Sequence, residues 1–89
     1  MRRVFNYEFE DESGQSTISF EYGEEIEEKL AVKIEGGIPV LYGNKQAFLL
    51  LAKIFSKLSL GNYKNGFHLH INTDFDADEV EAIRVVLDK

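Results

Sequence analysis

The chain contains no cysteine and no tryptophan, and it has only one proline, one methionine and two histidines among its 89 residues. Without cysteine it can form neither a disulfide framework nor a thiolate metal site, which fits a reducing cytoplasm. No apolar run approaches the roughly 20 residues that cross a bilayer. No apolar core of signal-peptide length follows the start Met1–Arg3. We therefore expect a cytoplasmic protein that does not insert into a membrane.

The net charge of −6 is unevenly distributed along the chain. Residues 1–36 contain ten acids and four bases, whereas residues 37–89 contain six of each. A nucleic-acid-binding protein needs a basic stripe, so nucleic acid is not an expected partner. A clustered acidic half favours a basic protein partner, because long-range attraction speeds association. The alternative is that the surplus acid only keeps a small protein soluble.

Length and composition indicate one globular domain, residues 1–89, with a thin core. Apolar and polar residues alternate over four segments, which predicts half-buried strands at 4–10, 17–22, 30–34 and 66–72. Residues 38–42 contain Pro39, which restricts them to an edge strand or an extended lead-in. Residues 82–88 favour a strand because Val85 and Val86 are β-branched. A helix capped by Asp76 is the alternative there.

One strong helix is predicted to begin after the N-cap residue Asn44 and to run to about Leu60. Gly61 would end it in a left-handed conformation. The predicted core face contains Phe48, Leu51, Ala52, Phe55 and Leu58, and the opposite face contains Gln46, Lys53, Ser56 and Lys57. Leu49 and Leu60 interrupt that polar face. They form either a contact surface or a patch that a loop covers.

These elements predict an α+β fold, in which an antiparallel sheet of about five strands carries one main helix on its apolar face. The far face of such a sheet can remain open to solvent. It would display Glu8, Glu10, Thr17, Ser19, Glu21, Lys33, Glu35, His68, His70, Asn72 and Arg84. We expect a partner protein to bind at this face and at the polar face of the helix. The candidate partner-binding residues are Glu8, Glu10, Glu21, Leu49, Lys53, His68, His70 and Asn72.

His68 and His70 lie two apart on one face of a predicted strand, so they could share a metal ion with Asp74 or Asp76. This pattern raises the alternative of a small metal-dependent hydrolase. An ordinary solvent-facing pair explains it better, because no third histidine or cysteine exists. The acidic run 74–79 lacks the glycine of a calcium loop at its sixth position. No serine sits in a nucleophile elbow. We therefore expect no enzyme, no catalytic residue, no metal and no cofactor.

Three stretches, Gly43–Asn44–Lys45, Leu49–Lys53 and Gly66–Ile71 leading into Asp74–Phe75–Asp76, resemble a small bacterial immunity-protein family associated with polymorphic toxin systems, immunity protein family thirty-two. The resemblance covers residues 40–78, and its most specific part is the aliphatic helix followed by the His-x-His strand. It implies a non-enzymatic cytoplasmic protein that binds a cognate toxin and blocks it. The matching positions are Asn44, Lys45, His68 and His70.

The leading hypothesis from the sequence is therefore a toxin-neutralising protein that covers the active site or substrate groove of a basic toxin. The acidic amino-terminal half lies outside the resemblance, and its role follows from charge alone. Two alternatives stay open, the metal-dependent hydrolase and a structural module that forms a homodimer. Such a homodimer would pair through Leu49, Leu60 or an exposed edge strand.

Overall fold

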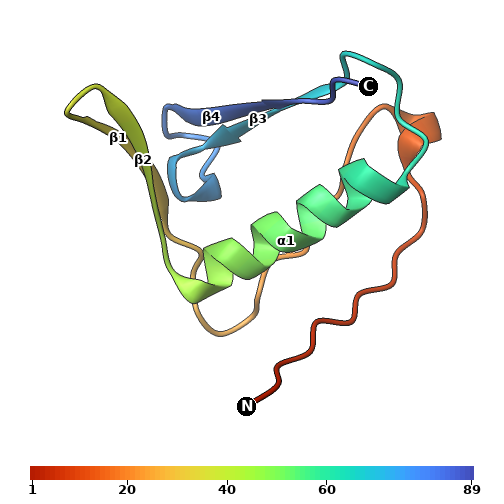
Figure 1. Cartoon of the computed structure of the whole chain (residues 1–89), viewed down its shortest axis with the longest axis horizontal. Coiled ribbons are helices and arrows are strands. Elements are labelled where there is room, and N and C mark those ends of the chain that lie inside the picture. The colour runs from red at the N-terminus through yellow and green to blue at the C-terminus, as the bar shows by residue number, and fades with distance from the viewer.

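The computed structural model describes all 89 residues and contains one α-helix and four strands. In chain order these are β1 (Leu30–Glu35), β2 (Ile38–Gly43), α1 (Lys45–Leu60), β3 (His68–Asn72) and β4 (Glu81–Val86), with short 3-10 turns at Ser13–Gln15 and Thr73–Phe75. The strands form two separate two-stranded sheets, β1–β2 and β3–β4, which lie beside α1 (Figure 1). The predicted α+β class is confirmed. The prediction of one sheet with about five strands is wrong.

The sheet is smaller than predicted because segments 4–10 and 17–22 do not form strands. Both lie within residues 1–11 and 17–28, which form no hydrogen bonds between backbone groups. Their alternation instead reflects one side that packs on the rest of the protein. Ile18, for example, is 9% exposed and lies in the core with Leu50 and Ile54. Alternating burial needs a surface on one side of the chain, but it does not need a neighbouring strand.

The hairpin β1–β2 follows directly from its turn. Gly36 and Gly37 have φ angles of 59° and 79°, and a tight two-residue hairpin turn requires such positive angles. Pro39 pairs with Ile34 in this antiparallel register. A two-stranded sheet consists only of edge strands, so the missing N–H of proline is tolerated. The prediction of an edge strand at residues 38–42 is confirmed.

Helix α1 begins as predicted, but it ends differently. The Asn44 side chain accepts a hydrogen bond from Ala47 N at 2.9 Å, so Asn44 is the N-cap. Gly61 is extended, with φ −75° and ψ 167°, so the predicted left-handed stop is wrong. Glycine is required there for space, because a Cβ atom would lie 2.7 Å from the carbonyl oxygen of Lys57.

The buried face of α1 is rotated relative to the prediction. Its buried residues are Ala47, Leu50, Leu51, Ile54, Lys57 and Leu58. Phe48 and Phe55 were predicted to be core residues but are 47% and 43% exposed. The rotation arises because the amino-terminal segment packs against α1 together with the strands, which centres burial on Leu50 and Ile54. Leu49 and Leu60 are exposed, and no loop covers them.

The strands β3 and β4 confirm the two remaining predictions. His68 and His70 are exposed, whereas Leu69 is half-buried and Ile71 is fully buried. Residues 81–86 form a strand, so the alternative helix there is wrong.

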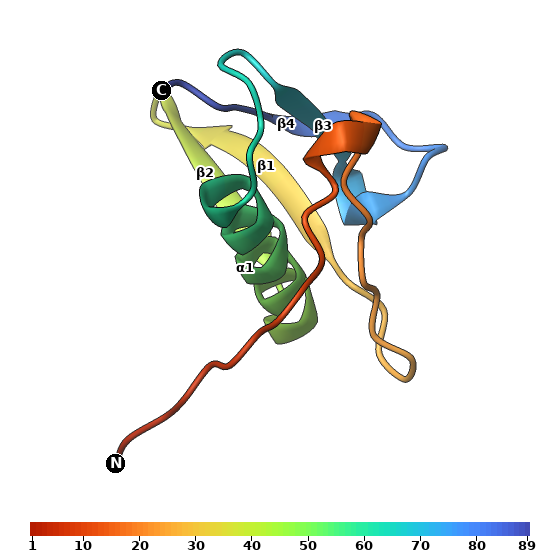
Figure 2. The ribbon, with the colours of Figure 1, turned by 90° about the vertical axis from the view of Figure 1, so that its right-hand side faces the viewer.

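Ile71 packs in a core cluster with Leu30, Ala47 and Leu51, which joins both sheets to the helix. A second view shows the two hairpins and the amino-terminal segment arranged around α1 (Figure 2). Helix α1 is not both long and apolar enough to cross a membrane.

Candidate functional site

The histidine pair lies on the solvent face of the β3–β4 hairpin. The ring centroids of His68 and His70 are 5.2 Å apart in an edge-on arrangement. His70 Nδ1 is hydrogen-bonded to Glu81, and Arg84 Nη2 donates to the other oxygen of Glu81 at 2.9 Å. The bond with His70 and then the bond from Arg84 lower the pKa of Glu81. The Glu81 carboxylate thus bonds to Arg84 on its own strand and to His70 on β3, which joins the two strands at the surface.

The metal-site alternative gains no support from this geometry. No group of three or more His, Asp or Glu side chains is arranged to hold a metal ion. The carboxylates of Asp74 and Asp76, the oxygen ligands of that alternative, accept hydrogen bonds from backbone N–H groups. Asp74 Oδ1 accepts from Leu30 N at 2.8 Å, and Asp76 Oδ1 accepts from Asp78 N at 2.9 Å. No observation therefore favours hydrolytic chemistry at the histidines.

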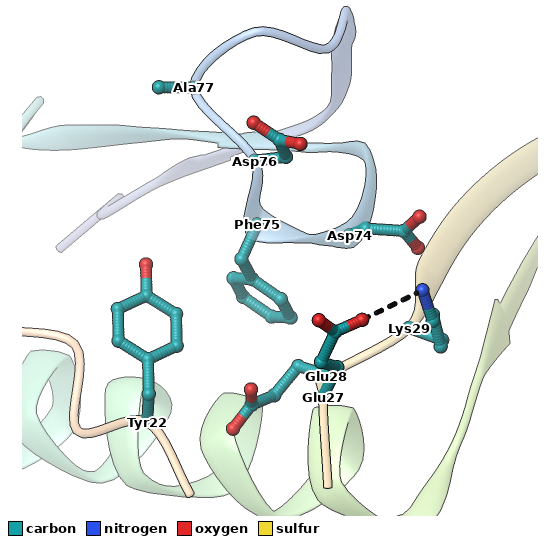
Figure 3. Close-up of a pocket in the computed structure, with 8 residues that line it drawn as sticks. All are labelled: Tyr22, Glu27, Glu28, Lys29, Asp74, Phe75, Asp76 and Ala77. Carbon is teal, nitrogen blue, oxygen red and sulfur yellow. Dashed lines mark hydrogen bonds and ion pairs between the residues drawn. The ribbon is translucent and has the colours of Figure 1, made fainter. Parts of the chain in front are cut away.

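Acidic residues from two distant segments line a hollow of about 460 Å³, which we call the acidic hollow (Figure 3). Eight residues line it: Tyr22, Glu27, Glu28, Lys29, Asp74, Phe75, Asp76 and Ala77. It contains four carboxylates and one ammonium group, and the Lys29 Nζ atom lies 3.3 Å from Glu27 Oε2. One of the four carboxylates is therefore paired within the hollow, and the hollow has a net negative charge.

The backbone of the acidic hollow is held in place by its own carboxylates. Glu28 is only 8% exposed, and its Oε2 atom accepts from Gly23 N at 2.8 Å. The Asp74 carboxylate fixes the start of β1 through Leu30 N, across 44 residues of sequence. Asp74 and Phe75 both have positive φ angles, 55° and 54°. This strained turn directs Phe75 to Tyr22, with ring centroids 6.3 Å apart. The hollow thus combines fixed acids with an aromatic wall.

A second hollow of about 410 Å³ lies where the amino-terminal segment meets α1. Its lining is Phe9, Glu10, Asp11, Glu12, Gln15, Ser19, Glu21 and Lys57. The Lys57 side chain is only 4% exposed. Its ammonium group donates to Glu12 Oε1 at 3.0 Å and to the Ser19 carbonyl at 2.9 Å, and it lies 3.5 Å from Glu21 Oε1. Its one ammonium group therefore contacts two of its four carboxylates, and this hollow also has a net negative charge.

The charges of this second hollow shift one another's pKa values. Hydrogen bonds from Ser19 and then Lys57 lower the pKa of Glu12 from 4.5 to about 2. Burial alone would lower the pKa of Lys57. The bond to Glu12 and the nearby negative charges together raise the pKa by more than burial lowers it, so the net shift is upward. Both groups remain charged at neutral pH. Their function is to hold the amino-terminal segment on the helix.

The structure does not gather the predicted partner-binding residues on one surface. Glu10 and Glu21 line the second hollow, while Glu21, Leu49 and Lys53 line a smaller hollow of about 60 Å³. Glu8 is exposed on the amino-terminal segment. His68, His70 and Asn72 lie on β3, outside these hollows. The continuous sheet face that would have joined them does not exist, because the first two predicted strands do not form.

Sequence reasoning missed the acidic hollow. Glu27 and Glu28 belong to an acidic connection, and Asp74 and Asp76 belong to an acidic turn. Each run taken alone is typical of a solvated loop. The sequence contains a signal for each run, but their meeting depends on the contact between β1 and the turn after β3.

Comparisons with protein-family models, with curated proteins and with solved structures each find no match to this chain.

Proposed function

We propose that this chain is a cytoplasmic, non-enzymatic binding protein that neutralises a basic protein toxin through the acidic hollow. The observation that carries the proposal is the convergence of Glu27, Glu28, Asp74 and Asp76 on one concave surface beside two aromatic rings. The resemblance of residues 40–78 to an immunity-protein family supports the toxin as the class of partner. The acidic balance of residues 1–36 supports a basic surface on that toxin.

The shape and chemistry of the hollow suit a lysine or arginine side chain of the partner. Its cationic end would meet the carboxylates of Glu27 and Asp76, which line the open hollow. A guanidinium group would also stack on Tyr22 or Phe75, since cations bind aromatic faces. Glu28 and Asp74 are already fixed by backbone bonds, so little side-chain entropy would be lost at these two residues. Binding there would place the body of this protein over the basic groove of the toxin.

The test is to recover the tagged protein from its native cells at low and at high salt, and to identify what accompanies it. We expect one stoichiometric basic protein that salt releases, because screening weakens attraction between exposed charges. That protein, expressed alone in a host cell, should inhibit growth, and coexpression of this chain should restore growth. A partner that salt does not release, or that does not inhibit growth, contradicts the proposal.

Charge reversal then locates the contact. Glu27→Lys should weaken partner binding about tenfold or more, mainly through slower association. Glu27 pairs only with exposed Lys29, so this change should leave the fold intact. Asp88→Lys is the matched control, because Asp88 is exposed and lies outside the hollow. Equal affinities of the two variants, measured by titration calorimetry, would place the interface elsewhere.

A further inference from the structure

The segment Arg2–Glu10 has the side-chain pattern of a β-strand but no strand beside it. Aromatic residues alternate with polar ones from Phe5 to Glu10. No backbone group of residues 1–11 is hydrogen-bonded to another backbone group of the chain. Figures 1 and 2 both show that this segment is extended and that its free end points away from the helix and the hairpins. Both edges of the segment are therefore open to a partner strand.

The aromatic side of this segment is already ordered. Lys53 Nζ lies 5.6 Å from the centre of the Tyr7 ring, on the side of α1. The ring centroids of Tyr7 and Phe9 are 5.4 Å apart, and those of Phe5 and Tyr7 are 6.1 Å apart. Rings on alternate residues can stack in this way only on an extended chain. A second strand would therefore bind a preformed template, and less conformational entropy would be lost on pairing.

The charged residues on the polar side of the segment can pair with those of a second copy of the segment. Residues that face each other across an antiparallel pair point to the same side of the sheet. If two copies pair about Asn6, then Arg2 of each copy lies opposite Glu10 of the other copy. Asn6 lies opposite Asn6, and the two central amides can bond to each other. The pairing thus contains two opposite-charge pairs and no like-charge pair, and it places Val4 of each copy opposite Glu8 of the other.

The aromatic side is compatible with the same register. Phe5 of one copy lies opposite Tyr7 of the other, which is a favourable aromatic cross-strand pair. Arg3 lies opposite Phe9, and a guanidinium group over an aromatic ring adds a cation–π contact. A shift of register by one residue would move the polar side of one copy to the aromatic side of the other. The contacts on both sides are therefore compatible with a register centred on Asn6.

We propose that the segment Arg2–Glu10 pairs antiparallel with the same segment of a second copy of this chain, about a two-fold axis at Asn6. The contact is isologous, so it closes with two copies. It uses none of the residues that line the acidic hollow. The homodimer and the toxin-binding surface are therefore independent, and Glu27→Lys should dimerise as the wild type does.

A charge-swap series tests the dimer by sedimentation equilibrium on the full-length protein. Glu10→Arg should raise the dimer dissociation constant about tenfold, because both symmetric pairs become repulsive. Arg2→Glu should do the same. The double variant Arg2→Glu, Glu10→Arg restores opposite charges and should recover wild-type dimerisation. Ser59→Arg, on the exposed part of α1, is the control and should have no such effect.

Cross-linking tests the register. The chain has no cysteine, so an introduced one has no competing thiol within its own chain. Asn6→Cys would place two sulfurs across the two-fold axis and should form a disulfide-linked dimer on mild oxidation. Ser59→Cys should cross-link far less. A protein that stays monomeric at high micromolar concentration, a dimer unaffected by the charge swaps, or equal cross-linking of both cysteine variants would overturn the proposal.

Discussion

Lys57 holds a nearly buried ammonium group between the carboxylates of Glu12 and Glu21, and this side chain attaches the amino-terminal segment to the helix. Its charge is compensated by both carboxylates and by the Ser19 carbonyl. A buried charge is tolerated only with such partners. The removal of one partner therefore changes both the attachment and the stability of the fold.

The first prediction concerns Glu12 and acid. Because the pKa of Glu12 is about 2 in the folded protein and 4.5 ordinarily, its contribution is complete above pH 4.5 and is lost as the pH falls toward 2. Glu12→Gln should lower the free energy of unfolding at neutral pH. It should also flatten the decline in stability between pH 4.5 and 2, measured by urea unfolding at several pH values.

The control for this prediction is Glu25→Gln, because the Glu25 side chain is exposed and forms no hydrogen bond or ion pair. It should keep the neutral-pH stability and the acid dependence of the wild type. If Glu12→Gln and the wild type lose stability in parallel below pH 4.5, the bonds to Ser19 and Lys57 do not stabilise the folded state.

At the scale of elements, Asn44 joins the start of α1 to the connection before β1. Its Oδ1 atom accepts from Ala47 N at the start of α1 and from Lys29 N just before β1, at 2.9 and 3.1 Å. Its Nδ2 atom donates to the Glu27 carbonyl at 2.8 Å. The cap therefore also positions the connection that contributes Glu27 and Glu28 to the acidic hollow.

The second prediction is that Asn44→Ala lowers the free energy of unfolding by about 1–2 kcal/mol, because a helix cap and two tertiary hydrogen bonds are lost. Asn44→Asp keeps both bonds accepted at the side-chain oxygen and should lose less. Chemical denaturation followed by circular dichroism measures both. Equal losses for the two variants would mean that the amide donor, and not the cap, is the important group.

The elements that the sequence predicted well are those with local signals. The edge strand with Pro39, the Asn44 cap and the alternation in β3 each depend on a few neighbouring residues. The strands expected at 4–10 and 17–22 failed because pairing is a tertiary event. Alternation indicates which side is covered, but it does not indicate what covers it.

For the whole molecule, Ile71 is the point where the two sheets and the helix meet. It is fully buried against Leu30 of β1 and against Ala47 and Leu51 of α1. A chain of 89 residues has a thin core, so each such position contributes a large share of the total stability. The acidic hollow depends on the same contact, since β1 and the turn after β3 meet beside it. No local pattern in the sequence predicts the contact between β1 and the turn after β3.

The third prediction follows from this position. Ile71→Ala should lower the free energy of unfolding by about 2–5 kcal/mol, because it leaves a cavity in a closed part of the core. Ile34→Ala is the matched control, since Ile34 is 68% exposed on the β1–β2 hairpin. Its cost should stay within about 0.5 kcal/mol. Similar losses for both variants, in urea unfolding, would contradict the placement of the core at Ile71.

The missing backbone hydrogen bonds of residues 1–11 and 17–28 have a consequence for the time scales of motion. Side chains hold this part of the chain in place, chiefly Ile18, Glu12 and Glu21. It can lift from α1 without breaking a single hydrogen bond of the helix or of either hairpin. Such local opening needs less free energy than global unfolding, and it is correspondingly more frequent. We therefore expect the first third of the molecule to open locally more often than the helix unfolds.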